Sequence, residues 1–387
     1  MPVEIELLDA GVAGLGESPL WDHRSGRLWW VDSTAARLHS SDAEGRDQTE
    51  WTLGQPIGSI GLAEGGLIVA LADGFCRFDT SSGEVSPVAR PAMAAGTRLN
   101  DGKADRAGRF LCASMRTGDA LGAGALFRLD TDGTTEQLES GIGIGNAICF
   151  SPDGDTLYFA DSLDGKLRRY AYDQATGAVG TRHDLVDCQA HGGSGADGAT
   201  VDAEGRIWVA LVLAQAVGCY SPEGKLLRSI PVPLPYPSCP AFGGPDLDIL
   251  YLTSIANSGH RLVADHPEAG RITAIRGLEV PGIAEGVYAK RSAIEMPPST
   301  RSDWPVTKPE RSLSAKKSTA SAMSVVSPRR PRGVLATRAS KVASSSIART
   351  PSVATVDGAT ALTRMAEGAS SIADERVMPS TAALIPQ

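Results

Sequence analysis

The chain has 387 residues, of which 42% are hydrophobic, so it is long enough to bury a sizeable core. Its formal net charge is −8, but residues 291–387 hold 14 Lys and Arg against 7 Asp and Glu, which leaves the first 290 residues strongly acidic. An acidic body argues against nucleic acid as a partner, and no apolar run approaches the ~18 residues of a membrane span.

The beginning of the chain and its cysteines bear on location. The start, MPVEIELLDAG, has neither a basic segment nor an apolar one, which predicts that there is no signal peptide. Six scattered cysteines form no C-x-x-C pair, and most stand in strand-like apolar contexts, which predicts buried free thiols. We therefore expect a cytoplasmic protein without disulfides.

The first predicted strand is VEIELL at residues 3–8, and six similar repeats follow it. Each repeat contains an eight-residue window in which a polar or Gly-containing turn precedes an apolar strand. The windows are SGRLWWVD at 25, EGGLIVAL at 64, AGRFLCAS at 107, GDTLYFAD at 154, EGRIWVAL at 204 and DLDILYLT at 246. Neighbouring strands before and after each window make a unit of four strands in about 45 residues, which is typical of a propeller blade.

We predict an all-β fold, a six-bladed β-propeller that occupies residues 1–290. VEIELL precedes the first repeat just as outer strands precede later ones, so we expect it to complete the last blade. Residues 291–387 are rich in Ser, Ala, Thr, Pro and Arg, hold one aromatic residue, Trp304, and show no sustained periodicity. We expect this tail to be disordered, because it cannot bury enough apolar surface to offset its chain entropy.

Four of the six repeats place a carboxylate or carboxamide at the same distance ahead of the apolar strand. These residues are Glu17, Asn100, Asn146 and Asp197, each ten or eleven residues before the first apolar residue of its window, whereas the other repeats have Ile57 and Ser238 there. That position precedes the innermost strand of a blade, which lines the central channel. The four oxygen-bearing side chains are therefore predicted to converge on the channel axis.

The chemistry of these side chains suits a cation. Two carboxylates brought together repel each other, and a divalent cation between them would relieve the repulsion. Because all the candidate ligands are oxygens, they favour a hard ion such as Ca²⁺, Mg²⁺ or Mn²⁺ over a thiolate-type zinc site. The alternative is that each residue only caps a strand or bonds a turn.

Five stretches carry a family pattern: LGESPLWD (15–22), RLNDGKADRAGRF (98–110), IGNAICFSPDGDTLYFADS (144–162), ADGATVDAEGRIWVAL (196–211) and AFGGPDLDILYLTS (241–254). Over about residues 5–290 the chain resembles the gluconolactonase / senescence marker protein (regucalcin) / luciferin-regenerating-enzyme family. The resemblance implies a six-bladed propeller with one divalent metal ion in its channel. It also implies hydrolysis of sugar lactones, the reaction of many members.

The resemblance implies roles for particular residues. Glu17, Asn146 and Asp197 are the implied metal ligands, and Asp197 is also the implied general base. Arg98 and Asn100 are implied to face the substrate or metal-bound water.

One loop departs from the family pattern. Some members place a Glu after the segment equivalent to CASM (112–115) to bind substrate hydroxyls, whereas the loop here, RTGDALGAGAL, has no Glu. Asp119 is the candidate substitute, and this departure bears on which substrate is used rather than on the reaction.

The predicted function is metal-dependent hydrolysis of a sugar lactone to the aldonic acid, which makes the protein a carboxylic-ester hydrolase. The metal ion (Ca, Mg, Mn, Zn or Fe) would act as Lewis acid and Asp197 as general base. The predicted partner is the small-molecule lactone, with neither nucleic acid nor membrane. Two alternatives stay open: a calcium-binding, regucalcin-like or scaffold propeller, and a hydrolase of another ester or a phosphotriester. The particular lactone, the particular metal and the oligomeric state leave no signal in the sequence.

Overall fold

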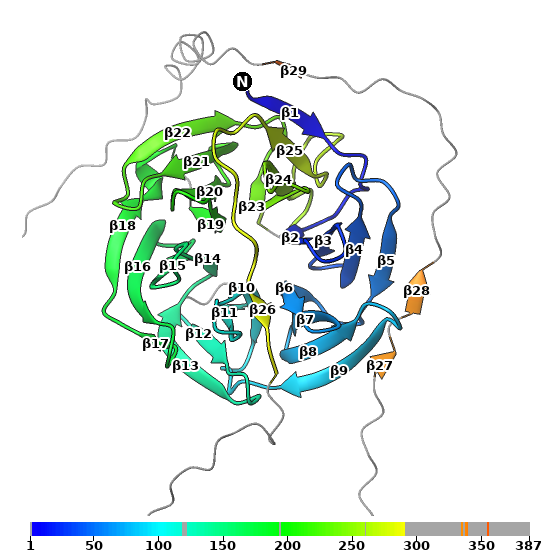
Figure 1. The fold of residues 1–387 in the computed structure, drawn as a ribbon, viewed down its shortest axis with the longest axis vertical. Coiled ribbons are helices and arrows are strands. Elements are labelled where there is room, and N and C mark those ends of the chain that lie inside the picture. The colour runs from blue at the N-terminus through cyan, green and yellow to red at the C-terminus, as the bar shows by residue number, and fades with distance from the viewer. Residues whose placement is uncertain are drawn as a thin grey trace, which may run out of the picture.

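The computed structural model describes residues 2–117, 122–192, 195–259 and 261–290, together with the backbone of three short strands farther along the chain. Apart from one 3-10 turn, η1 (Cys188–Ala190), the regular structure of these residues is β-strand. The strands form six small sheets arranged around a central axis (Figure 1). The predicted all-β fold with six propeller blades is confirmed.

Each blade runs from an innermost strand outward in chain order. The first three blades are β2 (Gly16–Asp22), β3 (Arg27–Asp32), β4 (Arg37–Ser41) and β5 (Thr49–Thr52); β6 (Ile57–Ala63), β7 (Gly66–Leu71), β8 (Gly74–Asp79) and β9 (Glu84–Ala89); and β10 (Thr97–Ala104), β11 (Phe110–Arg116), β12 (Gly124–Leu129) and β13 (Thr135–Ile142).

The other three blades also begin with their innermost strand, and the last of them takes its outermost strand from the start of the chain. They are β14 (Gly145–Phe150), β15 (Thr156–Asp161) and β16 (Lys166–Asp173), with β17 (Ala178–Val179) and β18 (His183–Asp187) both paired to β16; β19 (Ala196–Val201), β20 (Ile207–Leu211), β21 (Ala216–Tyr220) and β22 (Leu226–Pro231); and β23 (Pro237–Gly243), β24 (Ile249–Ser254), β25 (Thr273–Arg276) and β1 (Glu4–Leu7).

The burial pattern explains why these sequences form blades. Inner strands such as β7, GLIVAL, are buried along their whole length, because adjacent blades cover both faces. Outer strands such as β16 alternate buried and exposed residues along their second half. Between the first two blades the rings of Trp29 and Trp51 stack with centroids 5.4 Å apart, and Phe78 meets Trp51 edge-on. The cysteines lie in this core as predicted: none is bonded to another, and all but Cys76 are buried.

A strand from the beginning of the chain pairs with a strand of the last blade and so closes the ring. β1 is antiparallel to β25 in the last blade, with Ile5 opposite Ile275. The prediction that residues 3–8 complete the last blade is confirmed. The first blade begins directly after β1, so this pairing ties the first and last repeats together.

A segment that the repeats did not predict crosses one end of the channel. Residues 277–290, which we call the strap, leave the last blade after β25 and run across the centre of the ring, in yellow in Figure 1. Pro281 O accepts a hydrogen bond from Ala203 N at 2.9 Å, and β26 (Val287–Tyr288) pairs in parallel with the end of β6. The strap therefore covers the end of the channel at which the innermost strands finish.

Beyond the strap the structure describes only short strands. β27 (Val334–Leu335), β28 (Thr337–Ala339) and β29 (Ala354–Thr355) lie antiparallel to the outer strands β9, β5 and β1. The domain boundary at 290 and the disorder of residues 291–387 otherwise concern positions outside the described ones, and both stay predictions. Within the described part of the chain, no helix is long and apolar enough to cross a membrane.

Candidate active site

The innermost strands contact one another in a ring around the channel (Figure 1). Each of them carries a β-bulge near its start. The pairing with the second strand shifts between Glu17 and Leu20, Ile57 and Ser59, Leu99 and Gly102, Asn146 and Cys149, Ala196 and Ala199, and Pro237 and Pro240. A bulge leaves residues unpaired and turns a side chain away from its usual direction. The four polar residues found from the repeats all stand at these bulges, inside the strands rather than just ahead of them.

At two of the bulges the backbone is in the left-handed region, and at a third it approaches a neighbouring strand closely. Ser18 (φ 50°) and Ala147 (φ 55°) directly follow Glu17 and Asn146 in the left-handed region, which ordinary residues avoid. Gly198 directly follows Asp197, and a Cβ at this glycine would collide with Cys239 of the neighbouring innermost strand. Conformations of this kind cluster at functional sites, because the surrounding structure must hold them in place.

A chain of hydrogen bonds links the third, fourth and fifth blades at this level of the channel. Arg98 Nη1 donates to Asn100 Oδ1 at 3.0 Å, and Asn100 Nδ2 donates to Asn146 Oδ1 at 2.8 Å. Asn146 Nδ2 donates to Ser162 Oγ at 2.8 Å, and this hydroxyl donates to the carbonyl of Ala196, the neighbour of the predicted general base, at 2.6 Å. The buried amide of Asn146 therefore has a partner at both ends: Asn100 of the preceding blade and Ser162 of its own blade.

Three carboxylates share the same end of the channel. Burial, followed by the charges of Asp197 and Asp101, raises the pKa of Glu17 well above its usual range, and Arg98 opposes the shift. Burial and then the charge of Asp101 raise the pKa of Asp197 well above its usual range. The charge of Asp197 therefore acts on Glu17, although the two residues come from the fifth and the first blade.

The residues present fit a divalent cation. Glu17 and Asp197 offer carboxylate oxygens and Asn146 an amide oxygen, which are ligands that hard cations accept. Their mutual repulsion is the effect that a bound cation would remove. Among the described residues, no group of three or more His, Cys, Asp and Glu side chains could hold a metal ion. The predicted set contains only two residues of these types, with the amide as its third member, and its role as a metal site stays a prediction.

The raised carboxyl pKa values predict how the stability of the metal-free protein depends on pH. Between the ordinary carboxyl pKa of about 4 and the raised values, folded Glu17 and Asp197 keep protons that the unfolded chain has released, so stability falls as pH rises. A divalent cation at the predicted site would take the place of these protons. We expect the gain in Tm from saturating cation to be larger at about pH 8 than at about pH 5.

Differential scanning fluorimetry of the metal-stripped chain, with and without cation at each pH, measures this effect. Glu17→Gln is the control, because an amide cannot titrate and should flatten the pH dependence of the metal-free protein. Equal cation stabilisation at both pH values would contradict the electrostatic account.

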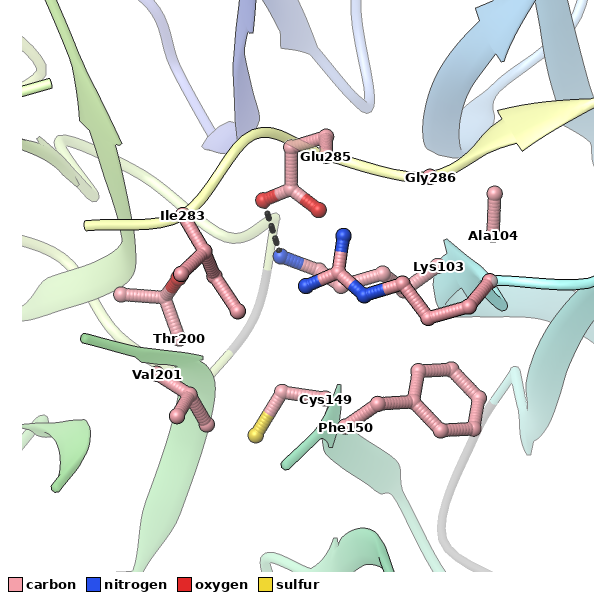
Figure 2. A pocket seen from close by; sticks show the side chains of 10 residues that line it. Lys103, Ala104, Cys149, Phe150, Thr200, Val201, Ile283, Glu285 and Gly286 are labelled. Carbon is pink, nitrogen blue, oxygen red and sulfur yellow. Dashed lines mark hydrogen bonds and ion pairs between the residues drawn. The ribbon is translucent and has the colours of Figure 1, made fainter. Parts of the chain in front are cut away.

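The far end of the channel is closed by an ion pair that sequence reasoning missed. Lys103 Nζ of β10 lies 2.8 Å from Glu285 Oε1 of the strap, and their side chains are only 16% and 13% exposed. Figure 2 shows this pair bridging β10 and the strap. Burial lowers the pKa of Lys103, but the charge and the hydrogen bond of Glu285, together with smaller contributions from two buried cysteines, raise it above its usual value. No repeat pointed to the pair, because the strap lies outside the repeats.

Asp101 stands beside Asn100 at the bulge of β10, and the only signal for it in the sequence was its place in the RLND stretch. Asp119, the candidate substrate contact, lies outside the described residues. The roles given to Arg98, Asn100 and the three implied ligands stay predictions, although the structure brings these residues together.

The fold and the site together define a class of protein: a closed six-bladed propeller with acidic and amide side chains gathered at the bulges of its channel. The profile of the SMP-30/Gluconolactonase/LRE-like region matches residues 15–256. The chain belongs to this family, and the resemblance noted in the sequence is confirmed.

Relatives match about two thirds of the chain. The chain is 38% identical over 245 residues to the pentonolactonase of Haloferax volcanii, covering 63% of this chain and 83% of that protein. It is 35% identical over 278 residues to the 6-deoxy-6-sulfogluconolactonase of Pseudomonas putida, covering 71% of this chain and 95% of that protein.

A solved structure matches a similar share of the chain. The regucalcin of Agrobacterium tumefaciens, described as a calcium-binding protein, superposes with a TM-score of 0.67 at 32% identity. The match covers 73% of this chain and 96% of that protein. Hydrolysis of a lactone is hydrolysis of a carboxylic ester, so the predicted enzyme class is the class to which the lactonases among these relatives belong.

Proposed function

We propose that this protein is a metal-dependent sugar lactonase, which hydrolyses the ring ester of a sugar lactone to the aldonic acid. The observation that carries the proposal is that Glu17, Asn146 and Asp197 each stand at the bulge of a channel-lining strand, in three different blades. The names of two relatives, a pentonolactonase and a 6-deoxy-6-sulfogluconolactonase, support the reaction class.

The proposed metal site consists of Glu17, Asn146 and Asp197 with one divalent cation. When bound, the cation would supply Lewis-acid polarisation of the lactone carbonyl and a lower pKa for an attacking water. The chain itself contributes the orientation of the amide ligand, through the bonds of Asn146 with Asn100 and Ser162.

The proposed role of Asp197 is to take a proton from the water that attacks the carbonyl carbon. Burial raises the pKa of this carboxyl, which makes its carboxylate a stronger base than an exposed aspartate. The water oxygen first bonds to the carbonyl carbon, and the ring ester bond then breaks. The proton that Asp197 has taken passes to the departing ring oxygen, which becomes a hydroxyl. The products are an open-chain aldonic acid and a regenerated site.

The proposed role of Arg98 is to bind oxygens of the substrate. Its Nη1 donates to the carbonyl of Leu99 at 2.9 Å and to Asn100 Oδ1 at 3.0 Å, which fixes the guanidinium beside the bulge. A guanidinium has five N–H donors, so others can serve the hydroxyl or ring oxygens of a bound lactone. Asn100 anchors this arrangement to Asn146.

A pH-indicator assay on the full chain tests the proposal. Aldonolactones with five and six carbons, including a 6-sulfonated one, would be offered after chelation and after return of Ca²⁺, Mg²⁺, Mn²⁺, Zn²⁺ or Fe²⁺. We expect acid release that chelation abolishes and one or more of these ions restores. Lactonase activity that survives complete chelation would contradict the metal site.

The same assay separates the alternatives. Faster turnover of a phosphotriester such as paraoxon than of every lactone would favour a different hydrolase. Tight Ca²⁺ binding without turnover of any ester would favour a calcium-binding propeller, the description given to the Agrobacterium tumefaciens regucalcin.

A further inference from the structure

Asp101 is a third carboxylate beside the proposed site, but its oxygens are engaged differently from those of a ligand. Its Oδ1 accepts the backbone N–H of Gly102 at 2.9 Å, and its Oδ2 accepts the backbone N–H of Ile148 at 2.9 Å. Gly102 is on the same strand, whereas Ile148 is on the innermost strand of the next blade. Both oxygens are therefore directed to backbone.

The N–H group of Ile148 lies in the unpaired part of the β14 bulge, between Asn146 and Cys149. Ile148 is fully buried, and an N–H group that a bulge releases from its sheet needs another acceptor. Leaving such a group without a partner costs about 1–3 kcal/mol. Asp101 supplies the acceptor, and it does so from within the bulge of β10.

The side chains of two adjacent residues consequently join the same two bulges. Asn100 Nδ2 donates to Asn146 Oδ1 at 2.8 Å and to the carbonyl of Gly145 at 3.1 Å, and the neighbouring residue, Asp101, accepts from Ile148 N. Asn100 alone would hold only the start of the β14 bulge, whereas Asp101 also holds the far side of Asn146, so the two side chains together set the relative orientation of the bulges. Asn146, two residues before Ile148, is oriented by this pair of contacts.

The charge of Asp101 is balanced from the closed end of the channel. Asp101, Lys103 and Glu285 line one small cavity together with Ser18 and Cys239. The ammonium group of Lys103 is held there by Glu285 of the strap at 2.8 Å (Figure 2). The strap therefore helps to keep the positive charge of Lys103 near the carboxylate of Asp101.

We propose that Asp101 is a positioning residue, which joins the bulges of β10 and β14 and thereby holds Asn146 and Asn100 in the orientation that the site uses. Its effect on cation binding rests on the proposed function, whereas its effect on the two bulges does not. Residues that orient metal ligands through hydrogen bonds change metal affinity by about 10–100-fold when they are replaced.

The test compares Asp101→Asn with Asp105→Asn in the full-length chain. Asp105 is the matched control, since it is a buried carboxylate at the end of the same strand that accepts two backbone N–H groups, those of Ala107 and Arg109. Loss of either carboxylate disturbs the third blade, but only Asp101 contacts the bulge of β14. Asp101→Glu keeps the charge and moves the oxygens by one methylene, so it separates position from charge.

Two measurements decide the outcome. Calorimetric titration with the ion that restores activity should show affinity lower by about 10–100-fold in Asp101→Asn and Asp101→Glu and within threefold of wild type in Asp105→Asn. Hydrogen–deuterium exchange of the metal-free proteins should be faster in peptides covering 145–150 in both Asp101 variants and unchanged there in Asp105→Asn.

The exchange measurement needs neither metal nor substrate, so it tests the positioning role even if the wild-type protein binds no cation and the proposed function fails. Wild-type exchange across 145–150 in either Asp101 variant would overturn the proposal. Equal losses of affinity in Asp101→Asn and Asp105→Asn would also overturn it, because they would show a general effect on the blade.

Discussion

Replacing Asp197 with asparagine is expected to lower kcat/KM for the preferred lactone by about 10³-fold, because general-base catalysis contributes about 10²–10⁴ and an amide cannot accept the proton. The same change should leave the metal-free protein at least as stable as the wild type. Asp197 is one of the charges that raise the pKa of Glu17, so its removal relieves repulsion in the folded state.

Steady-state kinetics at saturating cation and thermal unfolding without cation measure the two parts of this prediction. Their opposite directions matter, since a variant that is inactive only because it unfolds would lose both. Asp132→Asn, an exposed turn carboxylate in the third blade, is the control and should change neither quantity. Activity of Asp197→Asn within tenfold of wild type would exclude Asp197 as the base.

Replacing Glu285 with alanine is expected to lower the free energy of unfolding by about 3 kcal/mol, because it leaves the ammonium group of Lys103 buried without its partner. The ion pair and backbone hydrogen bonds hold the strap across the channel. Loss of the ion pair should therefore also loosen the strap at the closed end of the channel. Urea unfolding followed by tryptophan fluorescence measures the change.

Glu279→Ala is the matched control, because Glu279 lies on the same strap but is exposed, and we expect a change within about 0.5 kcal/mol. Replacing both members of the pair with apolar residues, Lys103→Met with Glu285→Leu, should recover part of the loss, because neither charge is then left buried alone. A loss below about 1 kcal/mol in Glu285→Ala would show that water reaches Lys103 freely in the folded protein.

The fold could be predicted because each blade repeats a local pattern. Turns with glycine, buried runs such as GLIVAL and alternating outer strands recur at similar spacing, and each of these features depends on residues close together in the chain. The closing strand at residues 3–8 followed from the same rule, because a ring of repeats must place its leftover outer strand against the last blade.

Part of the candidate site was predictable for the same reason. In a repeat, a fixed distance along the chain corresponds to a fixed place in the blade, so Glu17, Asn100, Asn146 and Asp197 could be assigned to one level of the channel before their surroundings were known. The bulges themselves could not be predicted from spacing. They depend on how adjacent innermost strands pack, as the close approach of Gly198 to Cys239 shows.

The sequence by itself determined the number of blades, the closure of the ring and the alignment of four oxygen-bearing residues, because all three follow from local periodicity. Only the tertiary structure showed that Asp101 reaches Ile148, 47 residues away, and that Glu285 reaches Lys103, 182 residues away. These contacts join a bulge or a non-repeating strap to a distant strand. No local pattern encodes them, because they exist only once packing of the complete ring has brought the two partners together.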